Sequence, residues 1–378
     1  MLPLSVSSQL PSALARPHEH GGRARMSAPP VRIGLVGYGK GGRLFHAPLI
    51  EHAQGCEIGG VVVRSPERRA ALAADLPGVP VAGSLAELAD AGVDAVVVTT
   101  PLDSHLQLVH EAIGLGLPVV CDKPFARDAR AAREAVLAAE RAGVLLSVYQ
   151  NRRWDADFRT VQQVVTAGEL GAVLRFESRM EQPPQPEGLP VTGGGALLDL
   201  GSHAVDQALH LFGPVRSVYA ELRMAPGEVG FDEAFFVALH HLEGGVVSHV
   251  SGDWARQGDV GSRFRVDGAA ATLVVPDDDG QTERLMAGRT PGSEGSAWGT
   301  VPEIRWGAVH RGGAAERVPS ELGDWSAFYT GFARAVRGEG PPPVDPWDAV
   351  AGLEVLDAAR ASAAGSRVVD LGRAGRAG

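Results

Sequence analysis

The sequence predicts an α/β protein, with an N-terminal doubly wound parallel sheet and a C-terminal α+β domain built on an open, mostly antiparallel sheet. Over residues 30–150, short and continuously apolar runs alternate with helix-forming stretches, as parallel strands covered by helices on both faces require. After residue 150, longer runs separated by turns are typical of antiparallel strands. A chain of 378 residues also exceeds the usual size of one core, so two domains are expected.

The N-terminal elements follow one another as strand and helix. We expect strands at residues 31–36, 57–63, 95–99, 118–121 and 144–148, and helices at residues 43–53, 66–75, 103–116 and 127–142. The run Val96-Val97-Val98 is typical of a strand buried on both faces. His46 and His52 in the first of these helices are interpreted as surface or packing residues.

The C-terminal part opens with a predicted helix at residues 154–165, in which Phe158, Val161 and Val165 share one face. Strands are expected at residues 172–180, 215–222, 233–242 and 246–251, with a hairpin turn at Gly244-Gly245. Residues 276–320 look loop-like, and a last helix is expected at about 347–364. The predicted domains are therefore a disordered extension (1–29), the dinucleotide-type domain (30–150), the α+β domain (151–345) and a C-terminal helix and tail (346–378).

Composition excludes several classes of function. The chain has 35 basic and 45 acidic residues, so its net charge of −10 argues against nucleic acid as a partner. It has no apolar stretch of membrane-spanning length, and its first 25 residues lack the pattern of a secretory signal. We therefore expect a cytoplasmic protein, with Met26 preferred to Met1 as the start. Cys56 and Cys121 are interpreted as buried thiols, and no metal site is expected.

The first turn carries a glycine pattern that predicts a dinucleotide site. Gly37-Tyr38-Gly39-Lys40-Gly41-Gly42 fits G-x-G-x-x-G between a predicted strand and a predicted helix. In such Rossmann turns the first glycine makes the bend, the second admits a pyrophosphate, and the third lets helix and strand approach. The residues expected to contact the cofactor here are Gly37, Tyr38, Gly39, Lys40 and Gly42.

The end of the second strand favours NADP over NAD. NAD sites usually place a carboxylate there to hold the ribose 2′-hydroxyl, whereas this chain has Arg64-Ser65, with Arg68 and Arg69 close behind. An arginine and a hydroxyl would bind a 2′-phosphate that a carboxylate would repel. The alternative is that Arg64 only stacks on the adenine and the cofactor is NAD.

Two further strand ends are expected to face the nicotinamide. Thr99, Thr100 and Pro101 follow the third long strand, with His105 at the next helix start. The next strand ends in Asp122-Lys123-Pro124. There the ammonium of Lys123 could reach a substrate oxygen and stabilise a developing alkoxide.

Residues 193–203 supply a candidate proton-transfer pair. Asp199 and His203 are four apart and share one face of a helix, and histidine can accept an alcohol proton near neutrality. Asp199 would orient the substrate or the histidine. The alternative is an ordinary hydrogen bond on a helix surface. Gly201 in the same helix indicates close approach, either of a ligand or of a packed neighbour.

Together, residues 37–42, 122–124, 151–158 and 193–203 resemble the Gfo/Idh/MocA family, above all its NADP-dependent scyllo-inositol dehydrogenases. The resemblance covers nearly everything after residue 30. It implies that Lys123, Asp199 and His203 are the catalytic set, that Arg153 and Trp154 border nicotinamide and substrate, and that the C-terminal sheet pairs subunits into a homodimer or homotetramer. It also implies hydride transfer at a secondary alcohol of a cyclitol or sugar-like substrate.

Two departures from the family pattern bear on that reading. Asp122 stands where the family usually has a longer glutamate, and residues 181–192, with four prolines, lack the aromatic and arginine residues of the inositol enzymes. Inositol itself is therefore in question as the substrate. Two other functions stay open: a glycosidase that uses tightly bound NAD for transient oxidation, and a non-enzymatic sensor of the NADP redox state.

Overall fold

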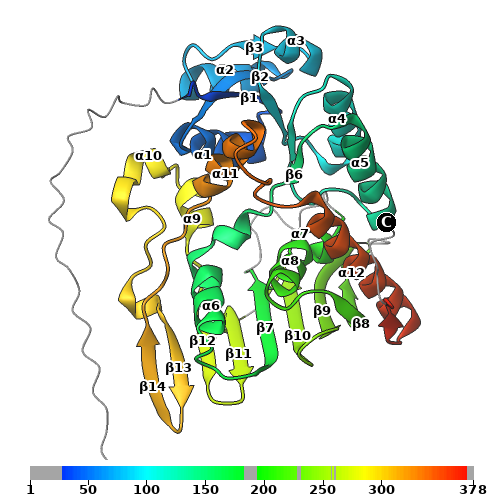
Figure 1. The fold of residues 1–378 in the computed structure, drawn as a ribbon, viewed down its shortest axis with the longest axis vertical. Helices are drawn as coiled ribbons and strands as arrows, with labels where there is room; N and C mark the ends of the chain where they lie inside the picture. The colour runs from blue at the N-terminus through cyan, green and yellow to red at the C-terminus, as the bar shows by residue number, and fades with distance from the viewer. Residues whose placement is uncertain (1–27, 183–193, 228–230, 257, 259–260, 373–378) are drawn as a thin grey trace, which may run out of the picture.

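The computed structural model describes residues 28–182, 194–227, 231–256, 258 and 261–372, and it contains two sheets (Figure 1). The predicted fold class is confirmed: the first sheet is parallel and the second is mostly antiparallel. The predicted N-terminal extension up to residue 27, the choice between Met1 and Met26, and the proline-containing stretch 183–192 lie outside the described residues.

The N-terminal sheet has the order β3-β2-β1-β4-β5-β6, which reverses between β1 and β4 and creates the switch point where such folds bind ligands. Its strands are β1 (Val31–Val36), β2 (Cys56–Val62), β3 (Val81–Ala82), β4 (Ala95–Val98), β5 (Val119–Cys121) and β6 (Leu146–Val148). Its helices are η1 (Gly41–His46), α1 (Ala47–His52), α2 (Pro66–Asp75), α3 (Leu85–Asp90), η2 (Leu102–Ser104), α4 (His105–Gly114) and α5 (Ala129–Ala142).

Local capping explains where these helices begin. Ser65, Ser84 and Asp128 accept a hydrogen bond from the third backbone N–H of α2, α3 and α5. Gly143, at a positive φ of 65°, ends α5. Helix α2 lies where the sequence predicts it. Strand β3 and helix α3 were not predicted, because two and six residues are too few to show a periodic pattern of apolar residues.

The C-terminal sheet has nine strands in the order β14-β13-β12-β11-β7-β10-β9-β8-β15. They are β7 (Val173–Glu181), β8 (Val215–Met224), β9 (Asp232–His241), β10 (Val247–Asp253), β11 (Phe264–Gly268), β12 (Thr272–Val275), β13 (Gly307–Arg311), β14 (Ala314–Val318) and β15 (Val369–Asp370). All neighbours are antiparallel except β7 and β10. The turn between β9 and β10 contains Gly244 and Gly245, both at positive φ as a hairpin turn of this kind needs.

The prediction of loop structure for residues 276–320 is wrong in part. That stretch contains α9 (Gln281–Met286), α10 (Pro291–Glu294), η4 (Gly295–Ala297), η5 (Glu303–Arg305) and the β13–β14 hairpin. Strand β14 is exposed on both faces along most of its length, so its residues show no alternation of apolar and polar character. The strands β11 and β12 were also missed, being only five and four residues long.

Segments from beyond residue 320 complete the N-terminal core. Helix α11 (Ser326–Val336), which the sequence analysis missed, lies beside α1 and β2 (Figure 1). It buries Phe328, Tyr329 and Phe332 against Leu49, Ile50 and their neighbours. The core under β1 is therefore completed by residues from much later in the chain.

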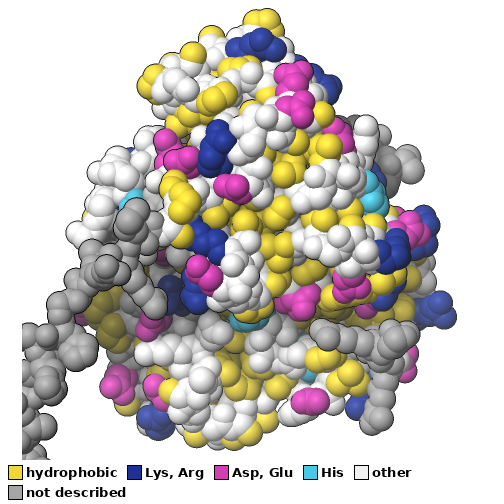
Figure 2. All heavy atoms as spheres, turned by 45° about the horizontal axis from the view of Figure 1, so that its top comes forward, with side chains coloured by type: hydrophobic (Ala, Val, Ile, Leu, Met, Phe, Trp, Pro, Cys, Tyr) yellow, Lys and Arg dark blue, Asp and Glu magenta, His cyan; other side chains and the backbone are white. Residues whose placement is uncertain are grey.

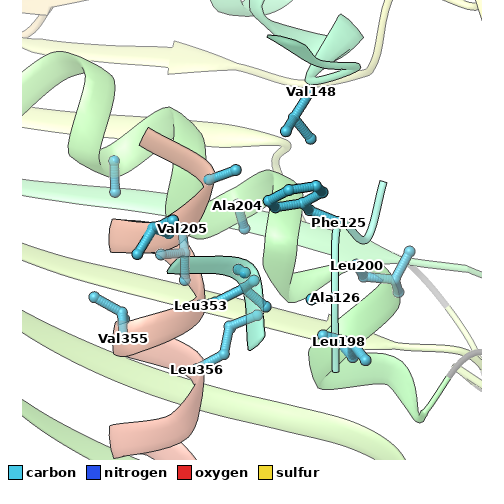
Figure 3. Close-up of a cluster of buried hydrophobic side chains, with 14 of the residues drawn as sticks. Phe125, Ala126, Val148, Leu198, Leu200, Ala204, Val205, Leu353, Val355 and Leu356 are labelled. Atoms are coloured by element: carbon cyan, nitrogen blue, oxygen red, sulfur yellow. The ribbon is translucent and has the colours of Figure 1, made fainter. Parts of the chain in front are cut away.

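The last predicted helix is confirmed as α12 (Pro346–Gly365), which packs on α5, α8 and β8. Figure 3 shows Leu353, Val355 and Leu356 of α12 in one buried cluster with Phe125 and Val148 of the first domain and with residues of the second. The second domain contributes α6 (Ala156–Thr166), α7 (Ala196–Asp199) and α8 (Gly201–Phe212). Apolar packing thus fixes the two domains against each other.

Figure 2 shows acidic, basic and apolar side chains mixed over the face of the molecule that it displays. Among the helices of the described residues, none is both long enough and apolar enough to cross a bilayer.

Candidate active site

The glycine turn between β1 and η1 has the geometry of a dinucleotide site. Gly37 has φ of +111°, and a Cβ on Gly42 would lie 2.3 Å from the carbonyl oxygen of Gly37. The first glycine is thus needed for the bend and the third for close packing. Around Gly39, by contrast, a Cβ would meet only the Arg68 guanidinium, at 3.8 Å or more. The turn is therefore open at the glycine where a pyrophosphate would approach.

The side chain of Tyr38 does not contribute to this opening, which corrects the expectation from its position in the motif. The ring is only 2% exposed, and its hydroxyl donates to Asp75 in α2, which also forms an ion pair with Arg43. Burial and the Asp75 charge raise the pKa of Tyr38. Only the backbone of Tyr38 remains available to a cofactor.

The end of β2 places charges of both signs beside the glycine turn. Arg64 and Arg68 are exposed, and the Arg68 guanidinium is the group nearest to the open side of Gly39. Ser65 caps α2 and donates its hydroxyl to Glu67 at 2.7 Å, and this bond lowers the pKa of Glu67. NAD sites usually carry their acidic residue at the strand end itself. Glu67 lies a few residues later, in α2, and its carboxylate beside the Ser65 hydroxyl was therefore not predicted.

The segment after β4 offers one unsatisfied polar group. Thr99 is buried, and its Oγ1 has no hydrogen-bond partner within the described residues. It lies 2.7 Å from where a Cβ on Gly41 would stand, so it faces the glycine turn. A buried hydroxyl without a partner is costly, which makes it a candidate contact for a bound ligand. Thr100 is half-buried and accepts from Ser104, and Pro101 is exposed.

His105 has a supporting position instead of the direct cofactor contact that was expected. Its ring is 2% exposed, and its nitrogens lie 2.8 Å from the Thr100 carbonyl oxygen and 3.0 Å from that of Pro124. Because both nitrogens are occupied, the ring links the loop after β4 to the loop after β5. His105 therefore holds two walls of the site together.

Lys123 and Asp199 meet across the domain boundary. Lys123 Nζ donates to Asp199 Oδ1 at 2.5 Å and lies 3.3 Å from the Asp199 carbonyl oxygen. The helix breaks at Leu200, so Asp199 ends α7 while His203 belongs to α8. Asp232 fixes the start of α7 by accepting from the Leu197 N–H. Asp199 is therefore paired with the lysine, whereas the sequence suggested the substrate or the histidine.

The chain contains only two lysines, Lys40 and Lys123, against 33 arginines. Lys40 lies exposed in the glycine turn, and Lys123 lies two residues after the end of β5. Both lysine side chains thus lie in the region predicted to bind the cofactor and the substrate.

His203 is buried in a positively charged surrounding. Its Nδ1 has no hydrogen-bond partner among the described residues. Burial, together with the charges of Lys123, Arg152 and Arg263, holds the pKa of His203 well below its usual range. The ring is therefore neutral near pH 7 and has the capacity to accept a proton. Because the Lys123 charge acts on this ring, the two side chains lie near each other, and the catalytic grouping of Lys123, Asp199 and His203 stays a prediction.

Behind His203 lies a buried network of ions. Arg152 contacts Asp155 at 3.0 Å, and Arg263 contacts Asp157 at 3.3 Å. Asp155, Asp157 and Asp279 have oxygens within 4.8 Å of one another. Burial raises the pKa of Asp157 to about 7 and that of Asp155 well above its usual value. Asp155 accepts from the Arg152 guanidinium and the Trp325 indole N–H, and Asp279 accepts from backbone N–H groups. Asp157 Oδ2 has no hydrogen-bond partner among the described residues.

Arg153 is not available to the nicotinamide, contrary to the expectation from the resemblance. It forms a two-point ion pair with Asp206 of α8, at 2.8 and 2.6 Å, and a third contact with Asp348 of α12. Its side chain is 9% exposed, so the guanidinium is fully engaged in joining helices. The adjacent Trp154 is half-buried and packs edge-on against Phe328 of α11.

For His46 and Gly201 the structure selects packing among the alternatives that the sequence left open. His46, expected as a surface or packing residue, is fully buried, and its Nε2 lies 3.1 Å from Asp122 Oδ2. Asp122 Oδ1 accepts the Lys123 backbone N–H. Gly201 is explained by packing, because a Cβ there would lie 3.3 to 3.4 Å from Leu197, Leu356 and Phe235.

Comparison with known proteins identifies the family. Residues 31–150 match the oxidoreductase family with an NAD-binding Rossmann fold, and residues 158–274 match the GFO/IDH/MocA C-terminal domain. The scyllo-inositol 2-dehydrogenase (NADP(+)) of Bacillus subtilis is 29% identical over 92% of this chain and 98% of its own length. The D-apiose dehydrogenase of Paraburkholderia graminis is 29% identical over 74% of this chain and 73% of its own.

A solved oxidoreductase from Bacillus cereus superposes with a TM-score of 0.81 at 26% identity, covering 90% of this chain and 98% of that one. The chain therefore belongs to the Gfo/Idh/MocA family and is an NAD(P)-dependent oxidoreductase.

The buried His203 predicts a measurable dependence of stability on pH. Its folded-state pKa lies below the unfolded value of about 6.5. Protons therefore bind the unfolded chain first, so stability is complete above about pH 6.5 and is lost as pH falls below it. Urea unfolding of wild type and His203→Gln between about pH 8 and pH 5.5 should show the wild type losing stability relative to the variant. Parallel curves would mean that His203 is as easily protonated in the folded protein as in the unfolded chain.

Proposed function

We propose that the protein transfers a hydride between NADP and a secondary alcohol on the ring of a cyclitol or sugar-like substrate. The observation that carries the proposal is the meeting of Lys123 and Asp199, with His203 close by, at the carboxyl end of a parallel strand. Ligands of open α/β sheets bind at that end. The named activities of the two curated relatives, on an inositol and on a sugar, support this substrate class.

The residues present fit a dinucleotide. Gly39 leaves the turn open, Thr99 Oγ1 is a buried hydroxyl without a partner, and Lys40 brings a positive charge. We expect the glycine turn and Lys40 to hold the pyrophosphate, and Thr99, Thr100 and Pro101 to border the nicotinamide half. When bound, the nicotinamide supplies or accepts the hydride.

The chain's own residues would handle the oxygen and its proton. The Lys123 ammonium would donate to the substrate oxygen and favour its alkoxide form. His203, kept neutral by burial and positive neighbours, would take the hydroxyl proton during oxidation and return it during reduction. Asp199 would orient the substrate and Lys123 together, since it already binds the ammonium. Trp154 would form part of the wall next to the substrate.

NADP is proposed over NAD on the charges at the end of β2. Arg64 and Arg68 are both exposed, and Arg68 stands at the open side of the glycine turn. Together with the Ser65 hydroxyl they would bind a 2′-phosphate. Glu67 opposes this, because it holds the Ser65 hydroxyl and carries a negative charge. NAD is the alternative if the negative charge of Glu67 excludes a 2′-phosphate from the end of β2.

We also propose that the C-terminal sheet pairs two copies of the chain in a homodimer or homotetramer. Helices cover one face of this sheet, and the other face has a depression of about 510 Å³ over β7, β9 and β10. Glu177, Arg179, Phe236 and His249 line it, so both signs of charge and an aromatic ring are present. A self-complementary surface of this kind suits a two-fold interface. A cytoplasmic location remains part of the proposal, since Cys56 and Cys121 are free thiols.

Removing the Lys123 ammonium should abolish most of the turnover. We expect Lys123→Ala to lower kcat with NADP and a cyclitol or sugar panel by roughly 10²-fold or more, the usual cost of losing a charge-stabilising donor. NADPH binding should stay near the wild-type value. The matched variant Lys40→Ala should instead weaken NADPH binding and leave turnover at saturating cofactor largely intact. Near-normal kcat in Lys123→Ala would remove the residue from the mechanism.

Fluorescence titration with NADPH and NADH tests the cofactor assignment. Wild type should bind NADPH more tightly, and Arg64→Ala should lose about 1–3 kcal/mol of NADPH affinity, the worth of a charge-assisted bond, without affecting NADH. Glu67→Gln should strengthen NADPH binding, since it removes the opposing charge. If the wild type prefers NADH and only Glu67→Gln reverses this preference, the cofactor is NAD and the NADP assignment is wrong.

Light scattering tests the pairing surface. The purified chain should have a mass of two or four chains, and Phe236→Lys, which puts an added charge into the depression, should reduce that mass. Since Phe236 is half-exposed on β9, the substitution leaves the core of the sheet intact. A wild-type mass of one chain at micromolar concentration would contradict the proposal.

A further inference from the structure

The first helical turn after the glycine loop is a π-helix, η1, and it ends at His46. Turns of this kind are rare and often occur at functional sites. His46 was expected to be a surface or packing residue, and its side chain is fully buried. The π-helix therefore brings an imidazole inward, beneath the end of β5.

Three groups surround the His46 ring. Its Nδ1 is in hydrogen-bond contact with the hydroxyl of Tyr329 from α11. Its Nε2 lies 3.1 Å from Asp122 Oδ2, which is ion-pair distance but outside hydrogen-bond geometry. The ring of Tyr149 packs against it with centroids 4.4 Å apart. The imidazole is thus held on all sides and has one anionic neighbour, Asp122.

Both carboxylate oxygens of Asp122 contact groups other than the Lys123 ammonium. Oδ1 accepts the Lys123 backbone N–H at 2.8 Å, and Oδ2 faces His46. Burial acts to raise the pKa of Asp122, but His46, His105 and Lys123 overcome it and hold that pKa below its usual value. The residue is therefore a carboxylate directly before the lysine in sequence, and Lys123 Nζ nonetheless binds Asp199.

We propose that His46 is a positioning residue for the hydride transfer: it holds the Asp122 carboxylate away from the Lys123 ammonium, which then stays beside Asp199 and accessible to a substrate oxygen. This inference rests on the role of Lys123 in the proposed function. Without His46, Oδ2 of Asp122 would be a partly buried anion lacking its partner, which is an unfavourable state. The nearest remedy is a turn of that carboxylate toward Lys123 in the same loop.

The scarcity of lysine makes the ammonium directly observable. With only Lys40 and Lys123 in the chain, protein labelled with ¹³Cε-lysine gives two side-chain signals. The variant Lys40→Arg removes one signal and assigns the other to Lys123. Its pH titration reports the charges near that ammonium, namely Asp122 in its own loop, Asp199 from α7 and His203 from α8, and requires no substrate.

Two amide variants separate the contacts of His46. The amide nitrogen of Asn takes the place of Nδ1, which faces Tyr329, and that of Gln takes the place of Nε2, which faces Asp122. We expect His46→Asn to raise the Lys123 titration midpoint, because Asp122 then approaches the ammonium. We expect His46→Gln to leave it at the wild-type value. His52→Asn is the control, since His52 is exposed on the neighbouring α1.

Turnover should follow the titration. His46→Asn should lower kcat roughly tenfold to a hundredfold, the cost of a misplaced catalytic group, with KM and NADPH affinity little changed. His46→Gln should retain most of kcat. If the two variants give the same Lys123 titration, whether shifted or not, the positioning role is wrong and His46 serves packing alone. If wild type turns over no cyclitol or sugar with NADP, the proposed function fails, while the titration still decides the role of His46.

Discussion

The contact between Lys123 and Asp199 joins the two domains at the one place where the chemistry would occur, and most of the structure serves to hold it. Lys123 follows a strand of the first sheet, and Asp199 ends a helix of the second domain. A distance of 2.5 Å between groups on separate domains tolerates little relative movement. The apolar cluster around α12 and the Arg153 contacts with α8 and α12 supply the required rigidity. Arg153 therefore contributes to the site by fixing its walls.

Charge balance is the second constraint on this site. Burial is the main reason that the pKa of His203 is low and its ring neutral, and the charges of Lys123, Arg152 and Arg263 act in the same direction. Those guanidinium groups lie 3.0 and 3.3 Å from Asp155 and Asp157, although burial raises the pKa of both carboxyl groups. The carboxylates are in turn close to Asp279, which accepts backbone N–H groups. The histidine and its ionic support thus form one network, and a change at Asp157 would reach His203 through Arg263.

The sequence predicted what depends on local pattern and missed what depends on distant contact. The parallel strands and the glycine turn are periodic or motif features, so they were found with boundaries close to those observed. The partner of Arg153 lies 53 residues away, and the partner of His46 lies 76 residues away, on strands and helices whose relative placement no local pattern specifies. The direction of the Tyr38 side chain was not predictable for a similar reason: its position in the motif does not reveal that its hydroxyl donates to the Asp75 carboxylate in α2. Short elements such as β3 and β14 escaped because two residues, or an exposed strand, carry no periodicity.

The choice of basic residue shows where an ammonium is chemically needed. Arginine provides 33 of the 35 basic side chains, including all those in the buried ion pairs, where a planar group that keeps its charge and binds two oxygens is favourable. Lysine differs in being compact and in having a pKa that its surroundings can move. A guanidinium at position 123 would hold Asp199 more rigidly and would release it less readily to a substrate oxygen. The two positions that carry lysine are the glycine turn and the end of β5, which is where a compact, adjustable charge would serve a phosphate and an alkoxide.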